Sequence, residues 1–334
     1  MPVDFSEASQ PFREDTVVPA LLQVSIADAA GMRAELAAGL LAPQAFVAPK
    51  YFYDPLGSKL FEAICELPEY YPTRTEAAIM ARHLDDIAAA AGTGVTLIDL
   101  GAGNCAKAER LFGALRPRQY VPVDISVDFL RDAVNALAQR HPGVEMLGIG
   151  ADFSVALDLP EAVRAEQRLF FYPGSSIGNF RPQEARAFLA GLRGQCTPGQ
   201  DGLLIGIDLV KERDILDAAY DDALGVTAAF NLNLLRHVNR ILGADFRLRD
   251  WRHRAFFNET DSRIEMHLEA RRSVAVHWEG GARRFEEGER IHTENSYKYT
   301  PGAIERLLAD AGFRLAHRWT DERGWFAVCH AIAC

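Results

Sequence analysis

The 334-residue sequence predicts an α/β fold: a doubly wound, mostly parallel sheet with an antiparallel hairpin at its edge, joined to a second α+β lobe. Two observations carry this prediction. Between residues 76 and 210, short apolar runs without polar alternation recur between stretches of helical periodicity, which is typical of buried parallel strands and their crossover helices. After residue 211 the pattern changes to a long helical region and then to polar–apolar alternation, which indicates a separate lobe.

The elements of the parallel core follow in a regular order. Buried strands are predicted at 95–100, 120–124, 144–150, 169–172 and 203–209. Helices are predicted before and between them at 76–91, 105–115, 126–137 and 182–194. Ser126 is placed to cap the third of these helices, and Pro182 opens the fourth. Thr300 and Pro301 begin a last helix that ends at Gly312, and residues 315–319 and 325–332 form the edge hairpin.

The remaining residues make up the second lobe. A helix at 27–41 ends at Pro43, and the aromatic-rich stretch that follows holds another helix at about 58–67. A long helical region covers 215–242, and alternation at 263–270 predicts an antiparallel sheet with one solvated side. We therefore expect a loosely ordered N-terminal segment at 1–25, one domain at 75–210 and 298–334, and a second domain at 26–74 and 211–297.

The composition argues against several classes of protein. The formal net charge of −10 disfavours a nucleic-acid-binding surface, because phosphate neutralisation needs clustered Lys and Arg. No apolar run is long enough to span a membrane, and the N-terminus lacks the pattern of a secretory signal. The five cysteines include no C-x-x-C pair, so we expect reduced thiols, a cytoplasmic location and no metal site. We also expect a monomer.

A glycine turn after the first core strand is the most informative local feature. Gly101 and Gly103 stand where a side chain would block a ligand or where φ must be positive. Asp99 can orient the turn or the amino-acid tail of a cofactor. Lys107, in the first turn of the next helix, is a candidate partner for a cofactor carboxylate.

Acidic residues also follow the next two strands. Asp124 is placed to accept hydrogen bonds from ribose hydroxyls, while Asp152 offers an acceptor for an exocyclic amine and Phe153 a ring to lie against adenine. Acidic positions at three successive strands indicate a nucleoside cofactor, and a turn with only two glycines favours S-adenosylmethionine over a dinucleotide. The turn alone does not exclude NAD, since Ala106 stands where a dinucleotide fingerprint has its third small residue.

Four longer strings go further than the cofactor turn. They are Tyr51–Phe61 (YFYDPLGSKLF), Leu67–Glu76 (LPEYYPTRTE), Gly174–Phe180 (GSSIGNF) and Ile207–Lys211 (IDLVK). Through them the chain, from about residue 30 to 332, resembles the histidine Nα-methyltransferases of ergothioneine biosynthesis. The resemblance implies a Rossmann-like class I methyltransferase fold with S-adenosylmethionine as cofactor. It also implies L-histidine as substrate, its α-amino group being methylated successively to trimethylhistidine (hercynine).

The resemblance implies a set of site residues as well. Cofactor contacts fall on Gly101, Lys107, Asp124, Asp152 and Phe153, within a cofactor-binding domain at 75–210 and 298–334. The substrate residues fall in the other domain and at its border. Asn179 and Tyr220 would hold the substrate's carboxylate and α-amine, with Gly174 nearby. Glu294 and Ser296 would contact the imidazole, Tyr53 and Tyr70 would close the pocket, and Met266 would pack against it. No residue is assigned as a catalytic acid or base, so Asn179 and Tyr220 act by positioning.

Plainer interpretations and other functions stay open. Tyr220 and Met266 could also be core residues. Asn179 could stabilise a turn, and Glu294 and Ser296 could lie on a solvated strand face. The family runs Glu-Ile-Ser and then a small residue, whereas this chain has Asn295 and Tyr297 on the opposite strand face, which leaves another amino acid or small amine as a possible acceptor. A non-catalytic nucleotide-binding subunit is a further alternative. A dehydrogenase is disfavoured, because no residue set suits hydride acceptance.

Overall fold

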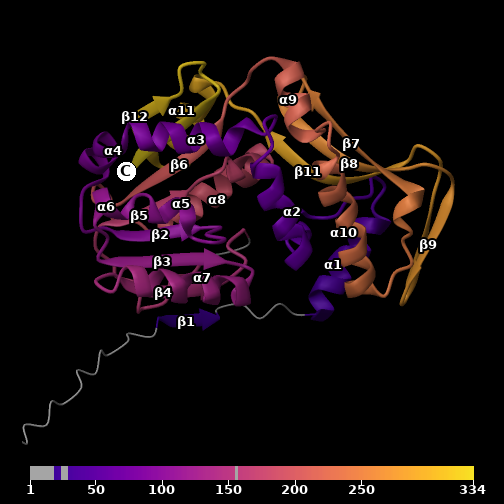
Figure 1. Cartoon of the computed structure of the whole chain (residues 1–334), viewed down its shortest axis with the longest axis horizontal. Coiled ribbons are helices and arrows are strands. Elements are labelled where there is room, and N and C mark those ends of the chain that lie inside the picture. The colour runs from indigo at the N-terminus through magenta and orange to yellow at the C-terminus, as the bar shows by residue number, and fades with distance from the viewer. Residues whose placement is uncertain (1–18, 24–28, 155–156) are drawn as a thin grey trace, which may run out of the picture.

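The computed structural model describes residues 19–23, 29–154 and 157–334, and their elements form two lobes side by side (Figure 1). We call the eight-stranded sheet with its flanking helices the sheet lobe. The elements at 29–65 and 213–297 form the other lobe, which we call the cap lobe. The hydrophobic core of the cap lobe is separate from the two cores that cover the faces of the large sheet.

The sheet lobe has the predicted doubly wound α/β architecture. Its strands, in spatial order, are β1 (Ala20–Gln23), β4 (Glu145–Gly150), β3 (Gln119–Asp124), β2 (Thr96–Leu100), β5 (Arg168–Tyr172), β6 (Gly202–Asp208), β13 (Phe326–Ala333) and β12 (Phe313–Thr320). The first six are parallel, and β13 pairs antiparallel with both β6 and β12, as the predicted edge hairpin requires. Every residue of β2 and β6 is buried, which explains why these strands are apolar without alternation.

The strand order places a crevice at one edge of this sheet. From β2 the chain winds outward through β3 to β4 and then returns to β5 on the other side of β2. Such a reversal leaves an opening at the carboxyl ends of the strands, where Rossmann-like folds bind their ligands. The cofactor turn follows β2 directly, so it lies at this opening.

Helices cover both faces of the sheet. They are α3 (Tyr71–Arg82), α4 (Leu84–Ala91), α5 (Ala106–Glu109), α6 (Phe112–Leu115), α7 (Val127–Arg140), α8 (Pro182–Gly194) and α11 (Pro301–Asp310), with the short 3₁₀ helix η2 (Ser176–Asn179). Two predicted helices are each divided in two. The stretch 76–91 breaks at His83, where the backbone leaves helical geometry, and the stretch 105–115 holds two four-residue helices.

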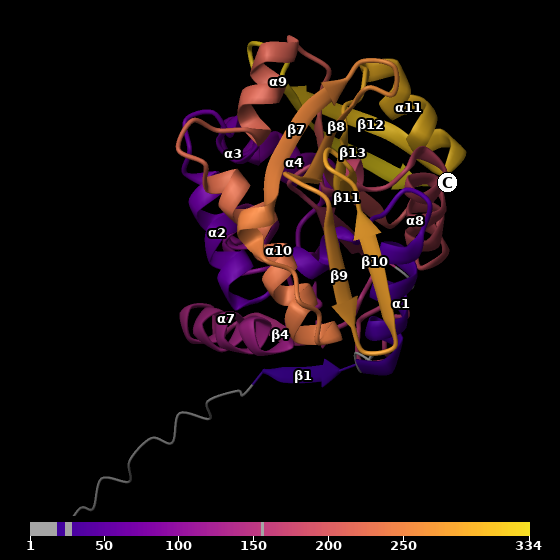
Figure 2. The same cartoon turned by 90° about the vertical axis from the view of Figure 1, so that its right-hand side faces the viewer.

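The cap lobe packs helices against a three-stranded antiparallel sheet (Figure 2). Its elements are α1 (Ala29–Leu41), η1 (Pro49–Phe52), α2 (Pro55–Cys65), α9 (Arg213–Tyr220), α10 (Val226–Leu242), η3 (Leu248–Asp250), β7 (Trp251–Asn258), β8 (Arg263–Ala270), the hairpin β9 (Val274–Trp278) and β10 (Gly281–Phe285), and β11 (Arg290–Tyr297). The long helical region predicted at 215–242 breaks at 221–225. Asp222 accepts hydrogen bonds there from the backbone of Val226 and Thr227, and thereby caps α10.

Two predictions about this architecture are wrong. Residues 20–23, expected within a loosely ordered segment, form β1 and pair with β4 of the large sheet; residues 1–18 and 24–25 of that segment lie outside the described residues. The charged face of β8 is buried instead of solvated: Glu265, His267 and Glu269 are 8%, 6% and 3% exposed. Arg252 of β7 and Arg290 of β11 pair with Glu269, and Arg263 of β8 itself pairs with Glu265.

In the part of the chain that the structure describes, no helix combines the length and apolarity needed to cross a membrane.

Candidate active site

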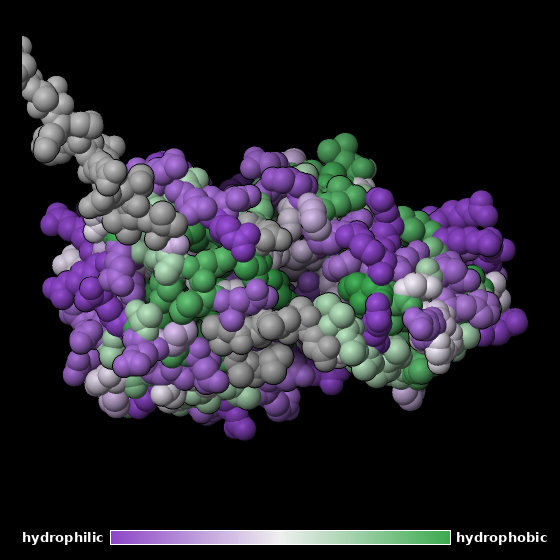
Figure 3. Space-filling model, turned by 90° about the horizontal axis from the view of Figure 1, so that it is seen from below, coloured by the Kyte–Doolittle hydropathy of each residue, from purple (hydrophilic) through white to green (hydrophobic). Residues whose placement is uncertain are grey.

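A large cavity of about 1580 Å³ opens between the two lobes. Seen from below, the surface is hollowed between them (Figure 3). The sheet lobe contributes the cofactor turn and the segments that follow β3, β4 and β5, while the cap lobe contributes η1 and α2. Nine of the predicted site residues line this cavity: Tyr53, Gly101, Gly103, Lys107, Asp124, Asp152, Phe153, Gly174 and Asn179.

The cofactor turn is held by Asp124. Gly101 and Gly103 have φ of +73° and +52°, which are left-handed conformations that favour glycine. The Gly103 N–H donates to Asp124 Oδ2 over 2.9 Å, and the Ser126 N–H donates to Oδ1 over 2.9 Å. The Asp124 carboxylate therefore fixes the turn while still lining the cavity, where its remaining lone pairs can accept from a ligand.

The predicted set of cofactor-binding residues needs one correction, because Asp99 does not line the cavity. Its side chain is buried within the sheet lobe, accepts a hydrogen bond from the Tyr120 hydroxyl over 2.7 Å, and is absent from the cavity lining. Burial raises the pKa of its carboxyl to about 7. Asp99 lies on β2 itself, one residue before the strand ends, so its side chain points into a packed face of the sheet instead of the crevice.

Glu76 is a site residue that the sequence did not single out. It lies on α3, is 1% exposed, and accepts hydrogen bonds from Lys107 Nζ at 2.8 Å and from the Gly174 N–H at 2.7 Å. A Cβ at Gly206 would lie 2.0 Å from Glu76 Oε1, so the glycine on β6 makes room for this carboxylate. Glu76 closes the quoted motif Leu67–Glu76, but a glutamate on a helix ordinarily faces solvent.

Lys50, which also lines the cavity, links the two lobes. This η1 side chain lies 2.9 Å from Glu35 of α1 and 3.2 Å from Asp152, which follows β4 of the sheet lobe. Phe153 packs beside Gly101 and contacts the rings of Tyr172 and Phe188. Asp152 and Phe153 thus both line the cavity, and Lys50 is a further charged group there that the sequence did not indicate.

The other predicted substrate residues lie behind the cavity lining. Tyr70, Tyr220, Met266, Glu294 and Ser296 are each at most 9% exposed. Tyr220 and Ser296 share a hydrogen bond of 2.8 Å between their hydroxyls, and the rings of Tyr70 and Tyr220 meet edge to face with centroids 6.0 Å apart. Met266 of β8 lies opposite Glu294 of β11 in the strand register.

Glu294 is a buried carboxyl with no hydrogen-bond partner among the described residues. Burial raises its pKa to about 7, and the nearby Lys298 ammonium opposes that shift. Burial also raises the pKa of the Tyr53 phenol, as do the negative charges of Glu294 and Asp124. Tyr53 thus connects the cavity to the buried residues behind it.

Asn179 reaches the cavity because η2 packs directly on β11. A Cβ at Gly178 would lie 2.9 Å from the Tyr297 carbonyl oxygen and 3.1 Å from the Tyr297 nitrogen, so only glycine allows this approach. Asn179 is the next residue, at the end of η2. Asn179 thus lines the cavity on a 3₁₀ helix that packs on the strand carrying Glu294 and Ser296.

Lys298 is the second buried group that sequence reasoning missed. Its ammonium donates to Ser296 Oγ at 2.8 Å and to the Tyr220 hydroxyl at 3.1 Å, and it lies 2.7 Å from Asp208 Oδ2. Residues 294, 296 and 298 share one face of an extended chain, so the period-two argument that grouped Glu294 with Ser296 also covers Lys298. Asp208, at the end of β6, lies within the quoted motif Ile207–Lys211.

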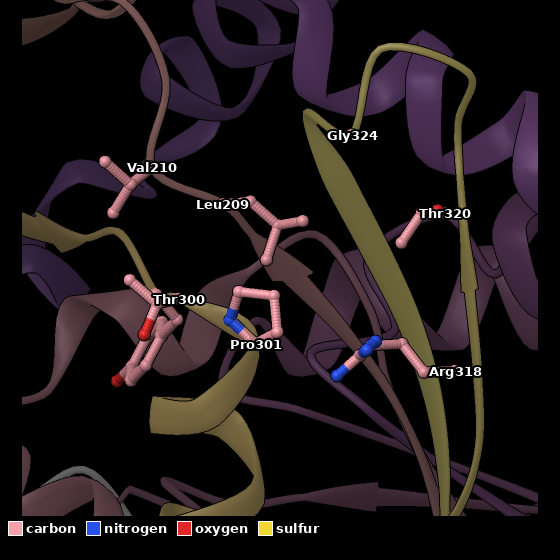
Figure 4. Close-up of a pocket in the computed structure, with 8 residues that line it drawn as sticks. Leu209, Val210, Thr300, Pro301, Arg318, Thr320 and Gly324 are labelled. Carbon is pink, nitrogen blue, oxygen red and sulfur yellow. The ribbon is translucent and has the colours of Figure 1, made fainter.

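A smaller pocket of about 420 Å³ lies elsewhere, between β12, β13 and the start of α11 (Figure 4). Leu209, Val210 and Pro301 contribute apolar walls, and Arg318 reaches across from the sheet edge. The Arg318 guanidinium pairs with Glu305. This pocket contains none of the predicted site residues.

The residues at the large cavity fit S-adenosylmethionine. A nucleoside with an amino-acid tail needs acceptors for its hydroxyls and exocyclic amine, an apolar ring contact, and a cation for its carboxylate. Asp124, Asp152, Phe153 and Lys107 supply these groups around one glycine turn. Among the described residues, no cluster of His, Cys, Asp and Glu could hold a metal ion.

Comparison with known proteins agrees with this site. A family model described as "Histidine-specific methyltransferase, SAM-dependent" matches residues 32–333. A histidine N-alpha-methyltransferase of Mycolicibacterium smegmatis is 43% identical over 313 residues, covering 91% of this chain and 95% of that protein. Another from Mycobacterium tuberculosis is 40% identical over 92% of this chain and 98% of that protein. Ergothioneine biosynthesis protein 1 of Neurospora crassa is 32% identical over 80% of this chain and 31% of that longer protein.

Proposed function

Because this chain belongs to the family of histidine-specific, S-adenosylmethionine-dependent methyltransferases, we infer that it methylates the α-amino group of L-histidine successively to hercynine, the first step of ergothioneine biosynthesis. Two observations support the assignment to the site: the Asp124-braced glycine turn lines a single cleft, and a buried wall of Glu294, Ser296 and Tyr220 lies behind the lining of that cleft. Tyr53 lies between the turn and this wall.

We assign the cofactor to the sheet-lobe side of the cleft. S-adenosylmethionine supplies a methyl group on a positively charged sulfur when it is bound. Asp124 accepts from the ribose hydroxyls, Asp152 and Phe153 bind the adenine, and Lys107, held by Glu76, binds the carboxylate. The open turn at Gly101 and Gly103 lets the backbone approach the cofactor closely. Residues 75–210 and 298–334 form the cofactor domain in this proposal.

Histidine then binds between the lobes, with residues 26–74 and 211–297 forming most of its site. The Asn179 amide lines the cavity beside Gly174 and can donate to the substrate's carboxylate. Glu294 accepts an imidazole N–H, with Met266 packed against it. The Tyr220 hydroxyl bonds to Ser296, so we assign it to the ring end of the pocket, although the family resemblance alone puts it at the carboxylate. Tyr53 and Tyr70 close the pocket.

Positioning and desolvation account for the reaction in this site. The nucleophile must be a neutral amine, and a free α-amine is largely protonated at neutral pH. A nearby sulfonium charge and a dry cavity both favour its neutral form, so no strong base is required. Burial raises the pKa values of the Tyr53, Tyr70 and Tyr220 phenols, which therefore stay protonated as hydrogen-bond donors. Holding the amine in line with the methyl group supplies most of the rate enhancement.

The departures at 295 and 297 do not alter the pocket lining in this proposal. Asn295 Oδ1 accepts from His292 Nε2 at 3.0 Å, and the Tyr297 hydroxyl accepts from the Arg263 guanidinium at 2.6 Å. Both side chains lie on the strand face opposite Glu294 and Ser296, paired in register with Glu265 and Arg263 of β8. The structural reason for expecting another amino acid or amine as acceptor is therefore removed.

The decisive experiment is a product analysis by mass spectrometry. The purified chain is incubated with S-adenosylmethionine and an equimolar mixture of free amino acids. We expect histidine alone to be consumed, through mono- and dimethylated forms to the trimethylated product. Methylation of a different amino acid, or no methyl transfer at all, would contradict the proposal; the second result would favour a non-catalytic binding protein.

We also propose that the enzyme acts in the cytoplasm as a monomer. All five cysteines are free, in keeping with a reducing compartment. The net charge of −10 disfavours nucleic acid as a partner.

A further inference from the structure

We propose that Lys298 is the positioning residue that sets the polarity of the substrate pocket, by making the Tyr220–Ser296 hydroxyl pair a hydrogen-bond donor toward the unprotonated ring nitrogen of histidine. The proposal rests on the proposed function and deepens it, because it names the feature by which the site recognises a neutral imidazole.

All three N–H bonds of the Lys298 ammonium are used inside the protein. The side chain is fully buried, and its acceptors are Asp208 Oδ2, Ser296 Oγ and the Tyr220 hydroxyl, at 2.7, 2.8 and 3.1 Å. An ammonium has three donors and no acceptor. Lys298 therefore has no proton left for a substrate, and it acts only through the groups that it contacts.

Asp208 keeps this cation in place. Its carboxylate, also fully buried, accepts from the Tyr71 hydroxyl and pairs with Lys211 as well as Lys298. Burial alone would lower the pKa of Lys298, but the negative charge of Asp208 and the hydrogen bonds to Asp208 and Tyr220 raise it above its ordinary value. The ammonium is therefore charged whenever the pocket is folded.

Counting protons shows what the hydroxyl pair can offer. The Tyr220 and Ser296 oxygens are 2.8 Å apart, so one hydroxyl donates to the other and one proton remains. A phenol is more acidic than an alcohol and is the better donor, so we assign the internal bond as Tyr220 to Ser296. Ser296 then accepts from both Lys298 and Tyr220, which fills its two lone pairs. Its own proton is the one left for the substrate.

Glu294 completes a recognition pattern for imidazole. It lies two residues from Ser296 on the same strand face, and its carboxylate can only accept when ionised. The wall therefore presents an acceptor and a donor side by side. A neutral imidazole carries one N–H and one lone pair, so it satisfies both groups at once. A ring without the lone pair would leave the buried Ser296 proton unpaired, and such mismatches discriminate strongly.

The test compares Lys298→Met with Lys211→Met. Both lysines contact Asp208, but only Lys298 reaches the hydroxyl pair, so Lys211→Met is a matched control for loss of a buried cation. Binding of histidine is measured by calorimetry with S-adenosylhomocysteine present. It is compared with binding of pyrrolylalanines, in which a C–H replaces the unprotonated ring nitrogen and the N–H is kept.

We expect the native enzyme to prefer histidine over the pyrrole analogues by roughly ten-fold or more, since an unpaired buried donor is costly. In Lys298→Met the ratio of the two affinities should fall close to one, because the Tyr220 and Ser296 hydroxyls, no longer held by the ammonium, can rotate to suit either ring. Lys211→Met should retain the preference for histidine. Histidine KM should rise in Lys298→Met by a larger factor than kcat falls, with affinity for S-adenosylhomocysteine unchanged. Thermal unfolding of both variants confirms that they fold.

An unchanged preference in Lys298→Met would overturn the inference, as would an equal loss of preference in Lys211→Met. Should Lys298→Met fail to fold, Ser296→Ala removes the same donor and must abolish the preference by itself. Failure of the native enzyme to methylate histidine would instead contradict the proposed function, so the two outcomes are distinguishable.

Discussion

Behind the lining of the cleft, the protein buries a carboxyl, two hydroxyls and an ammonium. Lys298 and Asp208 compensate each other's charge, and the hydroxyls of Tyr220 and Ser296 satisfy one another. Glu294 has no such partner among the described residues, which is why its pKa rises to about 7. Glu294 is thus a buried carboxyl without a hydrogen bond, and in the proposed function an N–H of the substrate would supply that hydrogen bond and offset the free energy of desolvation.

The titration of Glu294 makes stability depend on pH. Its pKa rises from an ordinary 4.5 to about 7 on folding, so between these values the folded protein binds more protons than the unfolded chain. The free energy of unfolding should therefore fall as the pH rises through this window, and the loss should be complete above it. For a shift of this size the loss is roughly 3 kcal/mol.

We expect Glu294→Gln to lack this loss. Urea unfolding at about pH 5 and about pH 8, without ligands, should show the native protein losing roughly 3 kcal/mol more than the variant. Asp99 titrates in the same window in both proteins, so it cancels in the comparison. If the free energy of unfolding changed with pH equally in the native protein and in Glu294→Gln, Glu294 would not be the group responsible for the pH dependence.

Asp124 should be the residue on which cofactor affinity depends most. Asp124→Asn keeps the shape of the side chain but replaces one of the oxygens that accept from Gly103 and Ser126 with a donor. We expect affinity for S-adenosylhomocysteine, measured by calorimetry, to fall by roughly ten-fold or more. Asp132→Asn, which removes the same charge from the exposed face of α7, is the control and should bind normally.

At the scale of elements, the site depends on how closely η2 approaches β11. Gly178 is the contact point, because a Cβ there would meet the backbone of Tyr297 at 2.9 Å. Backbone atoms cannot turn aside as a flexible side chain can, so any larger residue must move the whole 3₁₀ helix. Asn179 would move with it.

Gly178→Ala should accordingly weaken histidine binding while leaving cofactor binding nearly intact. We expect the free energy of unfolding to fall by about 1–3 kcal/mol, the usual cost of overpacking. Gly113→Ala is the control, since its Cβ meets no atom within 4 Å and its φ is not positive. Calorimetry with each ligand and urea unfolding would check both effects; a variant that binds histidine normally would contradict the role given to η2.

At the scale of the whole molecule, two lobes with separate hydrophobic cores enclose the reaction site. The Lys50 side chain bridges them, because it pairs with Glu35 of the cap lobe and with Asp152 of the sheet lobe. Both pairs are partly exposed, so they contribute little to the stability of either lobe. We therefore expect their effect to fall on the opening and closing of the cleft, a motion by which two-lobed enzymes admit substrate.

Lys50→Met should loosen the cleft without unfolding the protein. We expect a stability change below about 1 kcal/mol, together with faster amide exchange in residues 49–52 and 150–154 by hydrogen-exchange mass spectrometry. Arg82→Met removes a pair with Glu322 that lies within the sheet lobe, and it should leave exchange at these segments unchanged. Equal amide exchange in these segments of Lys50→Met and of the native protein would show that Lys50 does not hold the two lobes together.

The sequence alone determined those features that depend on neighbours along the chain. Apolar runs identified the buried strands, Gly101 and Gly103 identified the turn, and Asp124 followed from its place at a strand end. The family resemblance then implied roles for Asn179, which lies in one of the quoted strings, and for Glu294 and Ser296, which lie outside them; these roles stay predictions. Each of these signals is local, because strand burial, turn geometry and side-chain alternation are set within a few residues.

Only the tertiary structure decided which distant groups meet. Lys50 reaches Asp152 across 102 residues, Tyr220 reaches Ser296 across 76, and Glu76 reaches Lys107 across 31. The same holds for the charged face of β8, which alternation predicted to be solvated but which is buried, with Glu269 paired to arginines of β7 and β11. Whether a polar side chain meets water, an opposite charge or a ligand depends on packing between elements that are distant in the chain, and a local pattern of residues does not show that packing.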